Sequence, residues 1–405
     1  MKHIISTFVF ALFLGAVSLC CWLKPPTAFS ESERRLLAEK PQLSVETVAT
    51  GAFQKQFELY TVDQFPKRDS FRGLKATVAT YLFGKKDNNG LFTADGHLSK
   101  IEYPVNPQMV DYAEEKFNFL YETYMKDTNA KVYLSLVPDK NYFLAEKNGY
   151  LSIDYDAFIN DFKNRMDYME YIDILPLLSL DDYYRTDSHW KQEKIGDVAW
   201  HIGKSMGTDV ASKYTVKTLD NPFRGVYLGQ SALPFKPDTI QYLTSDVLSA
   251  CKVRYFDTGK AVPGEMYNME KAYGKDPYEM FLSGTSALIE IQNPNAATDK
   301  ELVVFRDSYG SSLVPLLVPG YSKITVVDIR YVQSSFLGAF LTFSDQDVLF
   351  LYSTTLLNNS MQCGKARLWQ NHSFCRSLLF FTNLAVRYML YRLYFCGIIG
   401  IYGII

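Results

Sequence analysis

The chain has 405 residues, of which 47% are hydrophobic and 21% are charged, so it is long and apolar enough to form a sizeable core. Its formal net charge of −2 provides no basic surface, which makes nucleic acid a poor candidate partner. The six cysteines include no C-x-x-C pair and the five histidines are scattered, so the sequence predicts no disulfide framework and no metal or cofactor site.

The N-terminus begins with an apolar run that predicts export. Residues 4–23, "IISTFVFALFLGAVSLCCWL", carry no charge, and as a helix they would span about 30 Å, the thickness of a bilayer core. We expect the segment 1–24 to be a secretory signal or a signal anchor. A possible cleavage sequence at 28–30 lies well past the apolar run, which favours an uncleaved anchor. The body of the protein is then expected on the extracytoplasmic face of the cell membrane, or secreted if cleavage occurs.

The rest of the chain divides into three further segments. Residues 25–45 are polar and helix-prone up to Pro41 and are interpreted as a stalk. A domain is predicted at 46–360, with an irregular insertion near 208–275. The tail at 361–405 is strongly apolar in its run 377–405, which still carries Arg387 and Arg392, and it has no amphipathic period. It is either a second membrane segment or a sequence read out of frame.

Within the domain, predicted helices alternate with apolar strands. The Asp95-Gly96 pair predicts a hairpin within 88–98. Helices are predicted at 107–126, 155–168 and 191–206, and buried strands at 131–138, 171–178, 287–291, 301–305, 323–329 and 347–353. Strands of near-continuous apolar character, separated by helices, indicate an α/β fold with a mostly parallel sheet covered on both faces.

Two segments at predicted strand ends contain the residue types of a serine hydrolase site. Ser308 follows the strand at 301–305 and precedes a short helix, where free backbone N–H groups stabilise negative charge. Asp187 and His189 follow the predicted strand at 171–178, and the carboxyl ends of parallel strands meet at one edge of a sheet. In such a site His189 is the base for Ser308, and Asp187 orients and stabilises the imidazole.

The same residues also have a purely structural interpretation. Asp187 or Ser188 could cap the helix at 191–206, and Ser308 could cap the helix that follows it. Two aromatic and two basic residues nearby could contact a glycan, or could instead be core residues and solvated charges. These four are Trp190, Tyr309, Lys140 and Arg306. Spacing alone leaves both interpretations open.

The motif "TDSHW" at 186–190, followed by "VVFRDSYGSSL" at the end of a strand, resembles the DHHW family of bacterial exported proteins. That family is related to the alginate O-acetyltransferase-like branch of the SGNH hydrolases. Ser188 stands where the family name has a histidine, which leaves the Asp-x-His pair intact. Other similar segments are "FSESERRLLAEKPQLS", "DQFPKRDSFR", "LVPDK" and "VLFLYSTTLLNNS". The resemblance covers roughly residues 29–360 and stops where the tail begins.

The resemblance implies a three-layer α/β/α SGNH-hydrolase-like domain with the nucleophile late in the chain. It implies that Ser308 takes an acetyl group, that His189 acts as base and then as acid, and that Asp187 orients His189. The backbone N–H of Ser308 is expected to be one oxyanion donor. Gly284 is the candidate for the second, although "FLSGTSAL" departs from the Gly-Gly-Asn expected there.

The expected function is that of a membrane-anchored O-acetyltransferase or acetylesterase acting on a cell-envelope polysaccharide through an acetyl-serine intermediate. A transferase would, by the resemblance, depend on an integral-membrane acyltransferase partner to supply acetyl groups. The alternative is a non-catalytic glycan-binding or polysaccharide-assembly protein on the same fold.

Overall fold

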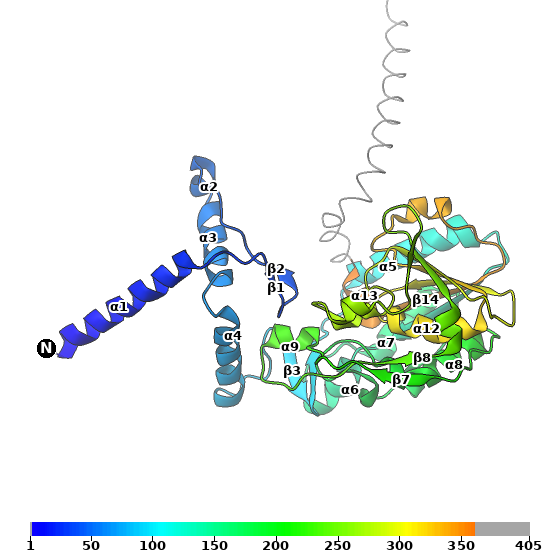
Figure 1. The fold of residues 1–405 in the computed structure, drawn as a ribbon, viewed down its shortest axis with the longest axis horizontal. Coiled ribbons are helices and arrows are strands. Elements are labelled where there is room, and N and C mark those ends of the chain that lie inside the picture. The colour runs from blue at the N-terminus through cyan, green and yellow to red at the C-terminus, as the bar shows by residue number, and fades with distance from the viewer. Residues whose placement is uncertain (1, 361–405) are drawn as a thin grey trace, which may run out of the picture.

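The computed structural model describes residues 2–360, and the tail predicted at 361–405 lies outside the described residues. The centre of the fold is an eight-stranded sheet in the order β10-β9-β11-β13-β12-β14-β5-β6. Figure 1 shows β14 of this sheet between α5 (Pro107–Leu120) and α12 (Gly310–Leu317). The strands from β13 to β6 are parallel, whereas β11, β9 and β10 each run antiparallel to their neighbours. The strands are β5 (Lys131–Val137), β6 (Glu170–Tyr171), β9 (Lys252–Tyr255), β10 (Val262–Gly264), β11 (Leu288–Gln292), β12 (Glu301–Arg306), β13 (Lys323–Val327) and β14 (Asp347–Ser353).

The parallel strands form where the sequence is continuously apolar. Every residue of β14 is buried, as expected for a strand covered on both faces. The strands predicted at 131–138, 301–305, 323–329 and 347–353 are confirmed, and the one at 287–291 is confirmed but antiparallel. The strand predicted at 171–178 is wrong. Only Glu170–Tyr171 pairs with β5, and Pro176, which has no N–H to donate, lies in a 3-10 turn.

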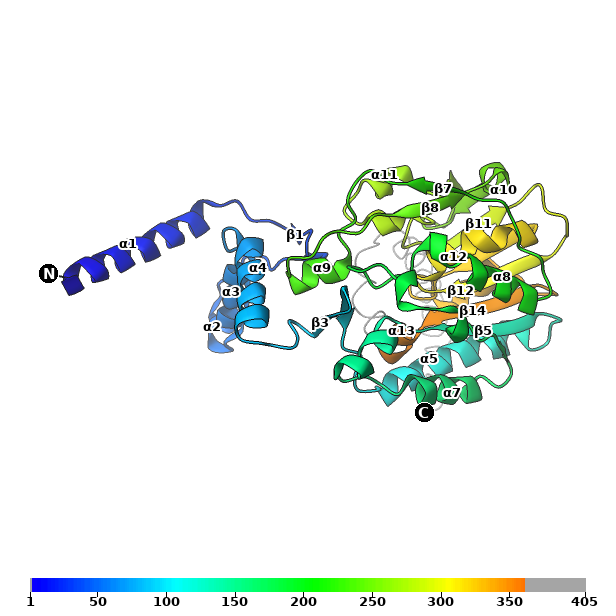
Figure 2. The same cartoon turned by 90° about the horizontal axis from the view of Figure 1, so that it is seen from below.

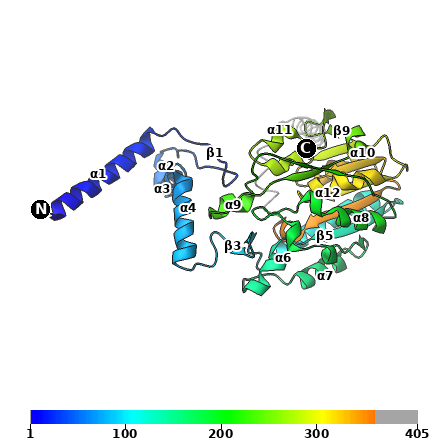
Figure 3. The same ribbon diagram turned by 60° about the horizontal axis from the view of Figure 1, so that its bottom comes forward.

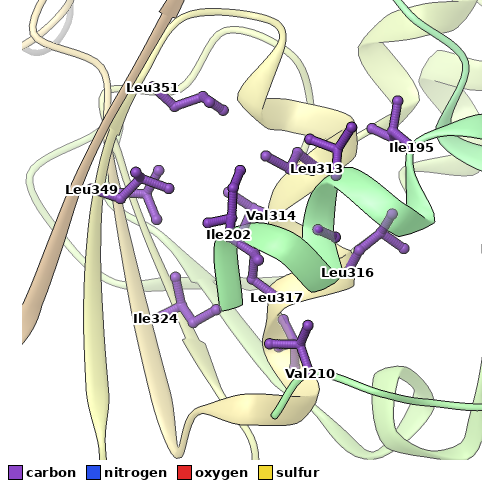
Figure 4. Close-up of a cluster of buried hydrophobic side chains, with 14 of the residues drawn as sticks. Ile195, Ile202, Val210, Leu313, Val314, Leu316, Leu317, Ile324, Leu349 and Leu351 are labelled. Atoms are coloured by element: carbon purple, nitrogen blue, oxygen red, sulfur yellow. The ribbon is translucent and has the colours of Figure 1, made fainter. Parts of the chain in front are cut away.

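Helices cover both faces of the sheet, which confirms the three-layer arrangement. Because side chains alternate along a strand, Leu349 and Leu351 of β14 pack with α8 and α12, while Val348 and Phe350 pack with α5 and α7. Figure 4 shows the first of these layers, with Ile202 of α8 against Leu313 and Leu317 of α12. The helices are α5 (Pro107–Leu120), α6 (Asn141–Leu144), α7 (Tyr155–Arg165), α8 (Gly196–Ser205), α12 (Gly310–Leu317) and α13 (Thr354–Asn358).

The segment between β6 and β11 contributes to the site and to the sheet. Its second half supplies β9 and β10 at one end of the sheet, and its first half places α9 beside the N-terminal region (Figure 2). The additional elements are β7 (Thr215–Thr218), which pairs with β8 (Gln241–Thr244), and the helices α9 (Val226–Ser231), α10 (Asp246–Ala250) and α11 (Met269–Ala272).

The N-terminal region forms an arm outside the sheet (Figure 3). The predicted helix before Pro41 is wrong, because residues 29–36 form a small antiparallel hairpin, β1 (Phe29–Ser30) with β2 (Arg35–Leu36). The helices of the arm are α1 (Lys2–Leu23), α2 (Val45–Ala49), α3 (Ala52–Asp63) and α4 (Arg68–Thr77). Across residues 2–360, no helix combines the length and the apolar character needed to cross a membrane.

The predicted hairpin at 88–98 is confirmed and connects the arm to the domain. Strands β3 (Leu91–Ala94) and β4 (His97–Lys100) pair antiparallel around Asp95 and Gly96. Both turn residues have positive φ, 47° and 75°, as a two-residue hairpin turn requires. The backbone N–H of Leu98 donates to the carbonyl of Arg185, which joins this hairpin to the loop that carries Asp187.

Candidate active site

Ser308 lies at a tight corner between β12 and α12. The preceding residue, Asp307, fixes this corner because its buried carboxylate accepts three hydrogen bonds. Two come from the N–H and hydroxyl of Ser353 at the end of β14, at 2.8 and 2.6 Å, and one from the N–H of Tyr309 at 3.0 Å. The corner is therefore bound to the end of the neighbouring strand, and the Ser308 side chain stays partly exposed at the edge of the sheet.

Asp187, His189 and Ser308 form a continuous hydrogen-bonded relay. The Nε2 atom of His189 lies 2.7 Å from Ser308 Oγ, and its Nδ1 atom lies 2.6 Å from Asp187 Oδ1. The second carboxylate oxygen of Asp187 accepts the N–H of Val226 at 2.7 Å. Asp187 is fully buried, whereas the His189 side chain keeps 13% exposure. The relay has the geometry that a nucleophile, its base and a group that orients the base require.

The loop that carries Asp187 and His189 is not part of the central sheet, and side chains hold it in addition to the backbone bond from Leu98 of β4 to Arg185. The carboxylate of Asp238 accepts the N–H groups of Arg185 and Thr186 and the hydroxyl of Thr186. From the other side, Lys140 Nζ donates to the carbonyls of Tyr184 at 2.8 Å and Arg185 at 3.2 Å. The loop therefore depends on Lys140, at the end of β5, and on Asp238, which lies between α9 and β8.

The electrostatics of the relay favour an ionised Asp187. Burial alone would raise the pKa of this carboxyl, but the charge and hydrogen bond of His189 and the charge of Arg34 hold its pKa below the usual range. The ring of Tyr278 stacks on the imidazole of His189, with centroids 3.9 Å apart and planes 10° apart. Burial raises the pKa of the Tyr278 hydroxyl, so this neighbour stays neutral.

The four residues proposed for glycan contact lie inside the protein. The indole N–H of Trp190 donates to Ser312 Oγ and to the carbonyl of Tyr309, and the Tyr309 hydroxyl donates to the carbonyl of Ser188. All four side chains are at most 4% exposed, so neither sugar stacking nor a solvated charge describes them. They are Trp190, Tyr309, Lys140 and Arg306.

The prediction that Gly284 supplies the second oxyanion donor is wrong. Its N–H donates to the carbonyl of Phe281, and its own carbonyl accepts Arg306 Nη2 at 3.0 Å. Gly284 is instead part of a tight turn, in which Leu282, Ser283 and Gly284 all have positive φ. The N–H of Ser308 remains the candidate oxyanion donor. Within residues 2–360, no group of three or more His, Cys, Asp or Glu side chains is arranged to hold a metal ion.

Three residues near the relay had no signal in the sequence. Tyr278 and Asp276 lie in an irregular segment that only the tertiary fold brings to His189. Arg34 is in a segment interpreted as a stalk, yet its guanidinium lies 3.8 Å from Asp187. Hydrophobic periodicity indicates where helices and strands lie along the chain, but not which loops lie close together in the fold. It could therefore not have predicted these contacts.

The comparisons with known structures identify the fold. A DHHW family protein from Eubacterium siraeum is 22% identical, over 68% of this chain and 95% of that chain, with a TM-score of 0.56. PatB1 from Bacillus cereus is 17% identical, over 67% of this chain and 97% of that chain, with a TM-score of 0.52. This chain has the DHHW protein's fold. The likeness inferred from "TDSHW" and "VVFRDSYGSSL" is thereby confirmed at the level of the fold.

The DHHW-type fold accounts for most of the described chain, since each aligned structure is covered almost end to end. A more distant likeness, with a TM-score of 0.40, is the O-acetyltransferase domain of AlgJ from Pseudomonas putida, which is 13% identical over 66% of this chain and 92% of that chain. No protein-family model and no curated protein sequence matches the chain.

Proposed function

We propose that this protein is a serine O-acetyltransferase or acetylesterase that modifies a polysaccharide through an acetyl-Ser308 intermediate. The observation that carries the proposal is the relay from Asp187 through His189 to Ser308, with both of its hydrogen bonds at 2.6 to 2.7 Å. The shared fold with a DHHW family protein supports the same reading.

In the proposed reaction, Ser308 Oγ attacks the carbonyl carbon of the acetyl donor while its proton passes to His189 Nε2. The bond between that carbon and the leaving oxygen of the donor then breaks, and the leaving oxygen takes the proton from His189. In the second half, His189 accepts the proton of an acceptor hydroxyl as its oxygen attacks the acetyl carbon. The bond from that carbon to Ser308 Oγ then breaks, and Ser308 Oγ takes the proton from His189. Asp187 stabilises the imidazolium that forms in each half.

The acceptor decides between the two activities. A sugar hydroxyl makes the protein a transferase, and water makes it an esterase. The partial exposure of His189, at 13%, supports access of an acceptor to the base. Incubating the acetylated protein with and without an oligosaccharide separates the two, because a transferase loses its acetyl group faster when the sugar is present.

The location and partners in the proposal rest on the sequence. The uncharged run at 4–23 supports attachment to the cell membrane with the domain outside the cytoplasm, and the resemblance supports an envelope polysaccharide and a membrane acyltransferase as partners. Cells that produce the full chain should retain it in the membrane fraction, where external protease digests it. Recovery in the soluble cytoplasmic fraction would contradict the anchor.

The decisive test is intact-protein mass spectrometry of the full chain after incubation with 4-nitrophenyl acetate, while release of nitrophenol is followed in the same samples. We expect one acetyl adduct or Ser308-dependent turnover, absent in Ser308→Ala and much reduced in His189→Ala. Ser311→Ala is the matched control, since this hydroxyl is buried one turn away and has no hydrogen-bond partner among residues 2–360. A folded protein with neither adduct nor turnover would reject the catalytic proposal.

The alternative, a non-catalytic glycan-binding protein, loses its main support. It relied on Trp190 and Tyr309 at the surface, and both are buried, with hydrogen bonds to neighbouring residues. That reading predicts full function for Ser308→Ala, so the same variant separates the two candidates.

A further inference from the structure

The N-terminal hairpin, residues 29–36, is seated against the helix that borders the relay. Gly229 of α9 allows this close approach, since a Cβ atom added there would lie only 1.5 Å from the carbonyl oxygen of Ser32. Arg72 of α4 spans the contact, because its Nη2 donates to the carbonyls of Gly229 and Gln230 and its Nη1 donates to Ser32 Oγ. The hairpin is therefore packed between α4 and α9 and does not extend freely from the domain.

A group of charges behind the hairpin fixes its orientation. Glu33 lies 2.5 Å from Arg68 and 3.2 Å from Arg72, both on α4, and all three side chains are less than a fifth exposed. The neighbouring Arg35 turns toward α3, where it pairs with the carboxylate of Asp63 at 2.6 Å. These contacts hold the turn so that the residue between Glu33 and Arg35 faces the domain.

That residue is Arg34, and its guanidinium reaches the back of the relay. Nη1 lies 2.5 Å from Asp276 Oδ2 and 3.8 Å from Asp187 Oδ2, and Nη2 donates to the carbonyl of Arg224 at 3.0 Å. Oδ2 is the oxygen of Asp187 that does not bond to His189. The Arg34 side chain is 16% exposed, and its φ of 53° places it in the left-handed region, which few non-glycine residues adopt.

We propose that Arg34 is a positioning residue of the active site, and that the N-terminal hairpin is needed to complete that site. The inference rests on the proposed function, because it concerns the base of the same relay. Two carboxylates, Asp187 and Asp276, lie close together behind His189, and Arg34 is the cation that bridges them. Its charge keeps Asp187 ionised and aimed at the imidazole.

Loss of this cation should change how readily His189 accepts a proton. Without Arg34 the surroundings of the imidazole become more negative, by less than one full charge, because Asp276 then takes up a proton more readily and offsets part of the lost charge. The change favours the protonated ring and leaves less free base near neutral pH. Among the described residues, other ionisable groups that interact with Asp187 or Asp276 include Lys140, Glu279 and the neutral tyrosines Tyr184, Tyr227 and Tyr278, and Asp238 acts on Lys140. They remain in the variant. Burial and the neighbouring Asp187 already raise the pKa of Asp276 to about 6 against the effect of Arg34.

The first test compares Arg34→Met, Arg34→Lys and Lys40→Met in the full chain. Ester turnover and the rate of Ser308 labelling by phenylmethylsulfonyl fluoride are measured from pH 5 to 9. We expect Arg34→Met to move the acidic limb of both profiles up by about one pH unit and Arg34→Lys to restore most of the shift. Lys40→Met removes one positive charge from an exposed position in the same N-terminal region, away from the relay and outside the contacts that hold the hairpin, and should leave the limb in place.

The outcomes separate this inference from the proposed function. An unmoved limb in folded Arg34→Met, or an equal shift in Lys40→Met, would overturn the role of Arg34 while the relay stands. A wild-type protein whose Ser308 shows neither turnover nor labelling would reject the proposed function itself. A merely structural role would lower the melting temperature without moving either profile.

A second test displaces the hairpin without changing any charge. Gly229→Ala forces the backbone of Ser32 to move, whereas Gly73→Ala on α4 meets no atom closer than 3.5 Å. We expect Gly229→Ala to expose the chain at Arg34 and Arg35 to trypsin and to shift the acidic limb as Arg34→Met does, while Gly73→Ala does neither. New cleavage at these arginines with an unmoved limb would overturn the inference.

Discussion

The two halves of the relay are built in different ways. Ser308 sits where β12 meets α12, and Asp307 ties that corner to the end of β14, so the central sheet itself positions the nucleophile. His189 lies in a loop without regular structure, which distant segments hold through Lys140, Asp238 and Arg34. The fold thus supplies the nucleophile's position, whereas the position of the base depends on contacts added around the fold.

The sharpest test of the loop half of the relay, which consists of Asp187 and His189, is Asp187→Asn. Asparagine keeps the shape but can no longer stabilise the imidazolium or enforce the correct tautomer, so kcat with an acetyl ester should fall by about 10⁴-fold. The exposed Asp181, earlier in the same segment, provides the control, and Asp181→Asn should stay within about 2-fold of wild type. A similar loss in both variants would mean that the segment, and not the relay, is being disturbed.

The sheet half of the relay, which is the corner that carries Ser308, is tested by Asp307→Ala. This change removes a buried acceptor of three hydrogen bonds and leaves the Ser353 and Tyr309 donors unpaired, so the free energy of unfolding should fall by about 3 kcal/mol or more. Denaturant unfolding measures it, with the exposed Asp345→Ala as control. Equal unfolding midpoints would show that the corner does not depend on Asp307.

Lys140→Met tests whether the loop depends on its contact with the end of β5. Two carbonyls lose their donor, which should cost about 1–2 kcal/mol of stability and reduce turnover by roughly 10-fold. Burial lowers the pKa of Lys140 to about 7, so the folded protein releases this proton at a lower pH than the unfolded chain does. Wild-type stability should therefore rise relative to the variant between pH 7 and about 10. Parallel stability curves over that range would contradict the assignment.

The smallest expected effect is that of Ser188→Ala. The hydroxyl of Ser188 lies 3.4 Å from both Asp187 Oδ1 and His189 Nδ1, which is long for a hydrogen bond. Turnover should change by less than about 2-fold. A loss greater than about 10-fold in the ester assay would place Ser188 among the groups that orient the base.

The sequence predicted the sheet half better than the loop half, for a physical reason. A buried parallel strand must be apolar along its length, so β5, β12, β13 and β14 leave a direct pattern in the sequence, and the Ser308 corner follows from it. The position of His189 does not follow from any local pattern. Its supports are single side chains far away in the chain, and the strand expected before it is broken at Pro176.

The sequence also left open which side chains near the site are buried. Trp190 and Tyr309 were equally consistent with a sugar-binding surface and with the core, because an aromatic side chain suits either place. Their hydrogen bonds to Ser312 and to the carbonyl of Ser188 exist only after α12 and the loop meet. Lys140 was expected to be at the surface because lysines are rarely buried, and two carbonyl acceptors made it an exception.

The hairpin contact also has a consequence for the order in which the protein is made and folds. Arg34 leaves the ribosome early, yet its partner Asp276 lies 242 positions later in the chain. Contacts of such long sequence separation form late, because they close a very large loop. A nascent or half-folded chain therefore lacks the complete charge cluster behind His189. The charge cluster is complete only when the N-terminal hairpin and the segment around Asp276 have come together.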